Sequence, residues 1–441
     1  MYLIDKDAEF TTVQLGKIIQ QFQTRDLPRL NKYYNYYKGK QAITRKKATD
    51  TGKPCNKVVV NYCYNIVQNY LGYMTGVSVD YTHEDNIDDL LDILNYNDVK
   101  SEDSEYLRNA LIFGRAFEMN YIDDDKKQRF RVLDSRQCIP VYDNTLNNDL
   151  RLVVRFWKED LIDKHSESYI VEVYDDKYRT KYRSTMGFTS FELLEKEPHY
   201  FSQCPITPFM LDEEEDPIFM QIMTLQDAYN ELISGEVDDF DSFCDAYLVL
   251  QGTTADDQDI EDMKKKRVLI MDEDADAHYL TKSVSDTQIE NMLTNINDQI
   301  HKIANSPDFN DEKFMAQSGV AMRYKLVGFE NKASDIESHM KKALQRRIEL
   351  IYNILRLTEG EEMWRDINIT FHRNLPEDIA DIANTVGQFR GLVSTKTLLS
   401  QIPFVSNVDD ELKEVEREQK ESMSLYRFDF NNKVDKEDDK Q

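Results

Sequence analysis

The first half of the chain changes from a helical to a strand-like pattern of apolar residues near residue 115. Apolar side chains recur every three or four residues in 11–38 and in 53–76, which predicts two amphipathic helices. A third helix is expected at 98–114, with acidic residues in its first turn. The segments that follow are rich in Val, Phe and Tyr: FEMNYID, FRVLD, LRLVVRFWKE, SYIVEVYD and YRTKYRS. They predict an antiparallel meander, so residues 1 to about 210 should form one α+β domain of helices packed on a sheet.

The second half of the chain has the pattern of long helices. Apolar stripes with intervals of three and four run through 218–250 and 289–303. A longer stripe through 318–357 predicts a helix of roughly 60 Å, at about 1.5 Å per residue. A strand at 367–371 is expected to return to the sheet, and further helices are expected after Pro376.

Two connections between the long helices have unusual compositions. Residues 252–285 predict a compact insert with a charged helix and two strands, at 267–271 and 278–282, joined by an acidic turn. Residues 306–317, within NSPDFNDEKFMAQSGVAM, predict a loop that contains two Phe. Loops between helices usually expose polar residues, and long loops often carry function. The aromatic residues therefore mark this loop as a candidate functional segment.

The composition argues against two common classes of protein. The 441 residues include 55 Lys or Arg and 82 Asp or Glu, for a formal net charge of -27. Tight DNA binding needs a basic face, so this acidity argues against it. It is compatible with DNA that slides along an acidic surface that repels it. No run of about 18 apolar residues predicts a membrane span, and MYLIDKDAEF lacks the pattern of a signal peptide. We expect a protein made in the cytoplasm, with reduced Cys and no membrane contact.

Sequence motifs for catalysis or metal binding are absent. The chain has no GxxxxGK[ST], HExxH, GxSxG or GxGxxG, and its five Cys form no CxxC pair. Asp272, Asp274 and Asp276 have the spacing that begins a calcium loop. However, Ala277 and Ser283 stand where that loop needs Gly and Glu, so a solvated turn is favoured. We expect no metal and no cofactor.

The Tyr-rich stretch NKYYNYYKGK allows two interpretations. Tyr33, Tyr34, Tyr36 and Tyr37 could stack on bases or sugars. Their helical spacing is also typical of a packing face at a helix C-terminus that ends at Gly39. The packing face is favoured, because buried aromatic side chains far outnumber nucleic-acid platforms.

The order of these pieces resembles the portal protein, or head-to-tail connector, of tailed bacteriophages, in the form found in siphophages of Gram-positive hosts. The resemblance spans about residues 30 to 420. It is carried by YYKGKQAI, KPCNKVVVNYCYNIVQNYLGYMTGVSVDY, LRNALIFGRAFEMNYID, LQDAYNELISGEVDDFDSFCDAYLVLQG, SGVAMRYKLVGFENKA and RNLPEDIADIANTVGQFRGLVSTKTLLSQIPFV. One departure is Cys55-Asn56, where the family commonly has Asn-Asn; it changes a local contact only.

The resemblance implies a portal-type α+β fold that forms rings. Its parts would be a wing at 1–235, stem helices at 236–251 and 286–305, a clip at 252–285, a tunnel loop at 306–317, a long wing helix at 318–357, a strand returning to the wing at 358–375, a crown at 376–422 and a disordered, charged tail at 423–441.

The resemblance also implies a function without catalysis. About twelve copies would form a ring with an axial channel, through which double-stranded DNA is packaged and ejected. The ring would sit at a unique capsid vertex of the virion and would dock the large terminase and a head-completion adaptor. Scaffolding and major capsid proteins would be further partners.

Site residues follow from these implied parts. The tunnel-loop residues expected to line the channel are Phe309, Asn310, Lys313, Phe314 and Met315, with Arg323 and Lys325 as further channel cations. The clip residues expected to dock partners and to contact neighbouring subunits are Lys264, Lys265, Lys266, Arg267, Asp272, Asp274 and Tyr279. On the long helix, Arg346 and Arg347 are expected to pair with acidic residues across the subunit interface.

Two other functions remain open at this stage. The chain could be a capsid-associated adaptor or scaffold component that never contacts DNA, which cross-linking from position 314 to DNA would test. It could also be a nuclease that uses metal ions held by carboxylates, because their convergence cannot be read from spacing. A cleavage assay with Mg²⁺ or Mn²⁺ would reveal such an activity.

Overall fold

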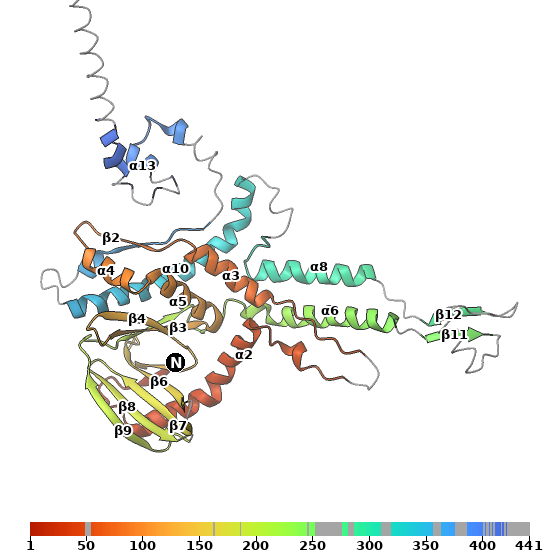
Figure 1. Ribbon diagram of the computed structural model, residues 1–441, viewed down its shortest axis with the longest axis horizontal. Coiled ribbons are helices and arrows are strands. Elements are labelled where there is room, and N and C mark those ends of the chain that lie inside the picture. Colours follow the sequence, from red (N-terminus) through yellow and green to blue (C-terminus); the bar gives the residue numbers. More distant parts are fainter. Residues whose placement is uncertain are drawn as a thin grey trace, which may run out of the picture. The chain divides into compact units, whose positions relative to one another are not determined.

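The chain forms two compact units, Met1–Asn374 and Leu375–Gln441. The computed structural model describes residues 1–48, 54–161, 164–185, 187–244, 247–251, 276–280, 286–309, 319–355, 363–374 and 386–399, together with scattered residues of 402–420. Helices and strands both contribute strongly (Figure 1), so the predicted mixed class is confirmed. No helix among the described residues is long and apolar enough to cross a membrane.

The strands of the first unit form two main sheets. The larger sheet has the order β1-β5-β6-β7-β8-β9, and β1 joins it parallel to β5. Its strands are β1 Tyr2–Ile4, β5 Cys138–Asp143, β6 Leu150–Leu161, β7 Lys164–Tyr174, β8 Tyr178–Thr185 and β9 Phe191–Pro198. The smaller sheet has the order β10-β3-β4, from Ile206–Met210, Arg115–Ile122 and Gln128–Leu133.

The prediction of a single antiparallel meander is therefore wrong. The strands belong to two sheets, and the chain passes from the smaller to the larger one after β4. At the division Ser135 is buried, and its Oγ donates to the Arg115 carbonyl oxygen at 2.8 Å. The Arg115 side chain returns a hydrogen bond to the Ser135 carbonyl oxygen at 3.3 Å. This exchange turns the chain out of the smaller sheet, and the next strand pairs with β6 instead.

Helices from the N-terminal region pack on these sheets. They are α1 Thr12–Gln21, a wider helical turn at Phe22–Asp26, α2 Leu27–Tyr37, α3 Tyr62–Thr75, α4 Asp88–Tyr96 and α5 Val99–Phe113. Tyr33, Tyr36 and Tyr37 are buried, and Gly39 beyond the end of α2 has a φ of 74°. The Tyr-rich stretch is thus a packing face, as favoured above.

The helix predicted at 53–76 begins only at Tyr62, and residues 54–61 belong to no helix or strand. The reason is a row of hydrogen bonds to helix α6, Met223–Cys244. The backbone N–H groups of Asn56, Val58, Val60 and Tyr62 donate to the side chains of Asp238, Ser234, Asn230 and Gln226 at 2.6, 3.0, 3.0 and 2.9 Å. We call these four contacts the polar ladder. They satisfy alternate backbone donors that a helix would otherwise use.

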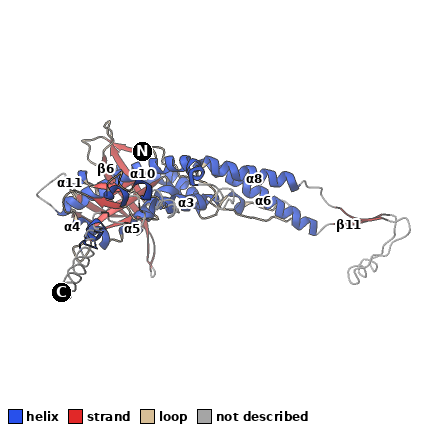
Figure 2. Ribbon diagram, turned by 90° about the horizontal axis from the view of Figure 1, so that it is seen from above, coloured by secondary structure: helices blue, strands red, loops and turns tan. Residues whose placement is uncertain are grey.

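Helix α6 lies beside α8, Asp286–Ile303 (Figures 1 and 2). The stem helix expected to continue to residue 251 ends at Cys244, and β11, Tyr247–Gln251, follows. Strand β11 pairs antiparallel with β12, Asp276–Leu280. The β-branched and aromatic content of YLVLQ suits a strand, and this pairing overrides the helical spacing. The expected strand at 278–282 is shifted to β12, and its expected partner at 267–271 lies outside the described residues.

The long helix is confirmed as α10, Gly319–Leu355. After the short helix α11, Met363–Asp366, strand β13, Asn368–Thr370, pairs with β2, Asp80–Thr82. The expectation that this strand returns to the main sheet is therefore wrong. Tyr81 and Ile369 are buried at this two-stranded pairing, which covers part of the core by itself. In the second unit the structure describes a short helix, α13, Thr395–Leu399. The tail 423–441 lies outside the described residues.

Candidate channel loop and its anchor

Most of the predicted channel and clip residues lie outside the described residues. These are Asn310, Lys313, Phe314 and Met315 of the loop, and Lys264, Lys265, Lys266, Arg267, Asp272 and Asp274 of the clip. Arg323 belongs to α10 and Tyr279 to β12, but their side chains are not described. Phe309 and Lys325 are described, and they lie on either side of the loop. The structure therefore shows how the loop is anchored.

Helix α3 holds the start of the loop. The Tyr70 hydroxyl donates to the Ala304 carbonyl oxygen at 3.1 Å, and the Asn69 side-chain amide donates to Ser306 Oγ at 3.0 Å. Ser306 is completely buried. His301 Nδ1 donates to the Ser306 carbonyl oxygen at 2.8 Å. The chain therefore leaves α8 through a fixed turn, because its buried polar groups all have partners there.

Phe309 packs inside its own chain. Its ring meets Phe329 of α10 edge to face, with 6.1 Å between ring centres. The Phe329 ring also contacts Tyr70 and Tyr73, at 4.5 and 4.6 Å between centres. Phe309 is half-buried in this aromatic cluster. This contact makes Phe309 part of the anchor of the loop. Its expected place in a channel stays a prediction.

A close approach between α10 and the turn explains one glycine. Asn305 has a left-handed backbone with a φ of 50°. A Cβ atom at Gly328 would lie 2.9 Å from Asn305 Oδ1, which is closer than real Cβ contacts. Gly328 therefore leaves room on α10 for the Asn305 side chain.

An open cavity of about 800 Å³ lies beside this anchor. Its lining includes Asp298, His301, Lys302, Asp308 and Lys325, so both signs of charge are present. His301 Nε2 lies 3.9 Å from Asp308 Oδ2. Within the part of the chain that the structure describes, no group of three or more His, Cys, Asp or Glu could hold a metal ion. The site can contact a partner, but its described residues show no catalytic arrangement.

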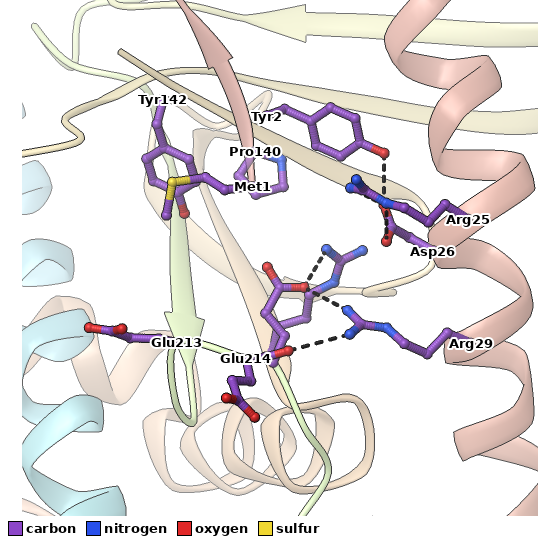
Figure 3. Close-up of a pocket in the computed structure, with 11 residues that line it drawn as sticks. Met1, Tyr2, Arg25, Asp26, Arg29, Pro140, Tyr142, Glu213 and Glu214 are labelled. Atoms are coloured by element: carbon purple, nitrogen blue, oxygen red, sulfur yellow. Dashed lines mark hydrogen bonds and ion pairs between the residues drawn. The ribbon is translucent and has the colours of Figure 1, made fainter. Parts of the chain in front are cut away.

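A second cavity, of about 230 Å³, lies between the large sheet and helix α2 (Figure 3). Arg29 and Arg115 both donate to Glu215 Oε2, at 3.3 and 3.0 Å. The Tyr2 hydroxyl donates to Asp26 Oδ2 at 2.7 Å. Burial acts to raise the pKa of Asp26, but hydrogen bonds from Arg25 and Tyr2 outweigh it and lower that pKa. The first two bonds tie α2 and β3 to the segment after β10, and the third ties β1 to the helical turn before α2. All three are structural contacts.

Arg346 and Arg347 make their contacts within the chain. Arg347 is fully buried, and it donates to Asp103 Oδ1 at 2.6 Å and to Glu118 Oε1 at 2.8 Å. Arg346 donates to the Cys204 carbonyl oxygen at 3.2 Å. The predicted pairing of Arg347 across a subunit interface is therefore wrong, because α5 and β3 of the same chain supply both of its acids. Sequence reasoning missed this cluster, although Arg347 lies on the apolar stripe between Leu344 and Ile351.

The charge of this cluster is unbalanced. Asp103, Glu118 and Arg347 are all buried, so one cation faces two carboxyl groups. Burial raises the pKa of both carboxyl groups, although Arg347 acts in the opposite direction. The cluster ties α10 to α5 and β3, and so it fixes the long helix that leads back from the loop.

Comparison with known proteins gives a consistent result. Residues 16–425 match the family described as phage portal protein, SPP1 Gp6-like. The portal protein of Bacillus phage SPP1 is 21% identical over 446 residues, covering 93% of this chain and 87% of that protein. The portal protein of Clostridium phage phiCD119 is 23% identical over 320 residues, covering 69% of each. A solved structure, the neck of an empty GTA particle computed with C6 symmetry, has a TM-score of 0.45 at 12% identity, covering 79% of this chain and 88% of that one. Because the family match extends over most of its length, this chain belongs to the phage portal protein family of tailed bacteriophages.

Proposed function

We propose that this chain assembles into a ring of about twelve copies whose axial channel passes double-stranded DNA during packaging and ejection. The family match over residues 16–425 is the observation that carries this proposal. As a portal protein the ring would occupy one vertex of the capsid. No catalytic role is proposed, so the energy for packaging must come from a partner, the large terminase.

The anchored turn at 304–309 supports a channel role for the rest of the loop. Its first residues are fixed by α3 and α10. A loop held rigidly at one end can present its remaining side chains at a constant place in every subunit of a ring. Lys313, Phe314 and Met315 would then form a collar, with one cation per subunit for DNA phosphates. The acidic remainder of the chain would repel DNA and let it slide.

The segment between α6 and α8 would be the docking platform. Strands β11 and β12 pair there, and among the described strands neither has a second neighbour, so each would offer an edge to a partner. A neighbouring subunit, the terminase or a head-completion adaptor would cover these edges. Scaffolding and major capsid proteins would contact the outer parts of the ring.

The first test is the mass of the purified chain in solution. Light scattering after size exclusion should give about twelve times the chain mass of 51.9 kDa, and negative-stain images of the same peak should show rings. A monomer that stays monomeric with scaffolding protein present would contradict the proposal.

The second test separates a DNA channel from an adaptor that never contacts DNA. Phe314→Ser should leave ring mass unchanged and reduce DNA packaging or retention, because the collar loses an apolar contact. Photo-cross-linking from position 314 should reach DNA in filled particles. Normal packaging by Phe314→Ser, with no cross-link to DNA, would favour the adaptor.

A further inference from the structure

Residues 38–48 are an exception in an acidic chain. This stretch, KGKQAITRKKA, holds five Lys or Arg and no Asp or Glu, whereas the whole chain carries a net charge of -27. We call it the basic segment. It follows α2 directly and includes a short helical turn, Ala42–Arg45.

The basic segment lies along the stem helix α6. Lys46 Nζ is 2.7 Å from Glu231 Oε1, and the Gln41 side chain contacts Asn230. Lys38, Lys40, Arg45 and Lys47 are exposed, and no ion pair to them is found among the described residues. Only one of its five positive charges is therefore neutralised within the described chain.

The opposite side of the same stem is acidic. Helix α8 carries three acidic residues, Asp286, Glu290 and Asp298, and one Lys, Lys302. Figure 1 shows α8 along one side of α6 and the segment that follows α2 along the other. Glu290 and Asp298 of α8 are exposed, and neither has an ion-pair partner among the described residues. Each stem thus has a basic side and an acidic side.

Identical copies with a charge of -27 repel one another, so their association needs local contacts between opposite charges. In a cyclic ring each copy uses two different surfaces, one for each neighbour. We propose that the basic segment of one copy docks on the exposed face of α8 in the next copy, with Lys40, Arg45 and Lys47 facing Glu290 and Asp298. This inference rests on the proposed ring, and it names the surfaces that close it.

Nucleic acid is the other partner that exposed cations could attract. The cations lie on an acidic helix within a strongly acidic chain, and that field opposes the approach of a long polyanion. A second copy presents only the few carboxylates of α8, among them the exposed Glu290 and Asp298. The observations therefore favour the second copy, and DNA becomes an outcome of the test.

The test reverses the charges on each surface and then on both. The variant Lys40→Glu, Arg45→Glu, Lys47→Glu should lower the ring fraction roughly tenfold or more, because like charges would then face each other. Glu290→Lys, Asp298→Lys should lower it in the same way. The chain that combines all five changes should recover rings, since the opposite charges again face each other with their signs exchanged.

A matched control changes the same net charge elsewhere. Lys17→Glu, Arg151→Glu, Lys158→Glu reverses three exposed cations of the wing, and it should form rings like the unchanged chain. Rings that persist in the basic-segment variant would overturn the inference. Unchanged rings with reduced DNA retention would assign the segment to nucleic acid instead.

A cross-link tests the contact independently of ring closure. In a Cys55→Ser background, Lys47→Cys on one chain and Glu290→Cys on another should form a disulfide-linked pair on a non-reducing gel. If the unchanged chain forms no rings but this pair still forms, the ring proposal fails and the contact stands. If rings form but the pair does not, the contact is wrong and the ring stands.

Discussion

Arg347 shows at the scale of one residue how the core of the first unit holds the long helix α10. One guanidinium serves two carboxyl groups that come from a helix and a strand far away in the sequence. Removing such a cation leaves buried acids without a partner, which typically costs about 3–5 kcal/mol. Arg347→Met should therefore lower the free energy of unfolding by about that amount, as measured by chemical denaturation. A loss well under 1 kcal/mol would mean that the carboxyl groups find other partners.

The same cluster predicts a dependence of stability on pH. Folding raises the pKa of Asp103 and Glu118, so the contribution of these groups is fully present in acid. This contribution is lost as the pH rises from the pKa of a carboxyl group in the unfolded chain, about 4, through the raised pKa values of Asp103 and Glu118 in the folded chain. Asp103→Asn leaves one cation with one carboxylate, so its free energy of unfolding should fall less between pH 4 and pH 7 than that of the unchanged chain. Asp125→Asn on the surface is the control, and equal slopes in all three proteins would contradict this account.

The limits of the sequence are visible at this scale. Tyr33, Tyr36 and Tyr37 could be assigned to the core because their spacing is that of a buried helix face. Arg347 could not, because a charged residue on an apolar stripe is compatible with either a partner subunit or a buried acid. Phe309 was expected in the channel for a similar reason. Its contact with Phe329 joins residues on two sides of a loop, and no local pattern encodes it.

At the scale of elements, the anchor of the loop should respond to loss of a single hydroxyl. Tyr70→Phe removes the hydrogen bond to the Ala304 carbonyl oxygen, and an unsatisfied buried acceptor costs about 1–3 kcal/mol. Backbone amides of 304–309 should then exchange hydrogen faster, while exchange in the sheets stays unchanged. Tyr200→Phe, at an exposed site, is the matched control. Equal exchange in both variants would show that α3 does not hold the turn.

The polar ladder gives a second prediction for an element. Asn230 is buried, accepts from the Val60 N–H and also contacts Gln41. Asn230→Ala should destabilise the chain by about 1–3 kcal/mol and should open residues 54–61 to limited proteolysis. The control is Thr294→Ala on the exposed side of α8, which should change neither the free energy of unfolding nor the proteolysis of residues 54–61. If residues 54–61 of Asn230→Ala stayed protected from proteolysis, the other three contacts of the polar ladder would be sufficient to hold the segment.

Elements with strong local patterns could be predicted well, whereas their pairing could not. Helix α10 was expected at 318–357 because its stripe hardly breaks, and it spans Gly319–Leu355. The division of the strands into two sheets depends on Ser135 and Arg115, which meet only in the folded chain. The end of α6 at Cys244 likewise depends on the strand partner of residues 247–251, about 30 residues further on.

At the scale of the whole molecule, ring formation should depend on the segment between the stem helices. Deletion of residues 253–284 should leave a folded chain, because the described core residues of the sheets and of α10 belong to other segments. It should abolish rings by removing the docking platform. Removal of 423–441 should leave rings intact and serves as the control. Rings of the deleted chain in electron micrographs would assign closure to other surfaces.

The polar ladder pairs two repeats of unequal length, one along helix α6 and one along the segment that donates to it. Its side chains on α6 are four residues apart, about 6.0 Å. Its backbone donors are two residues apart, which is about 6.6 Å in a fully extended chain. Over the three steps from Gln226 to Asp238, the difference between the two spacings adds up to roughly 2 Å. The hydrogen bonds can therefore form only over a short length and in one alignment of the segment along α6. A single residue inserted between Gln226 and Asp238 would turn the later side chains by about 100° around α6. The number of residues between these two positions is therefore fixed by the segment that donates to them.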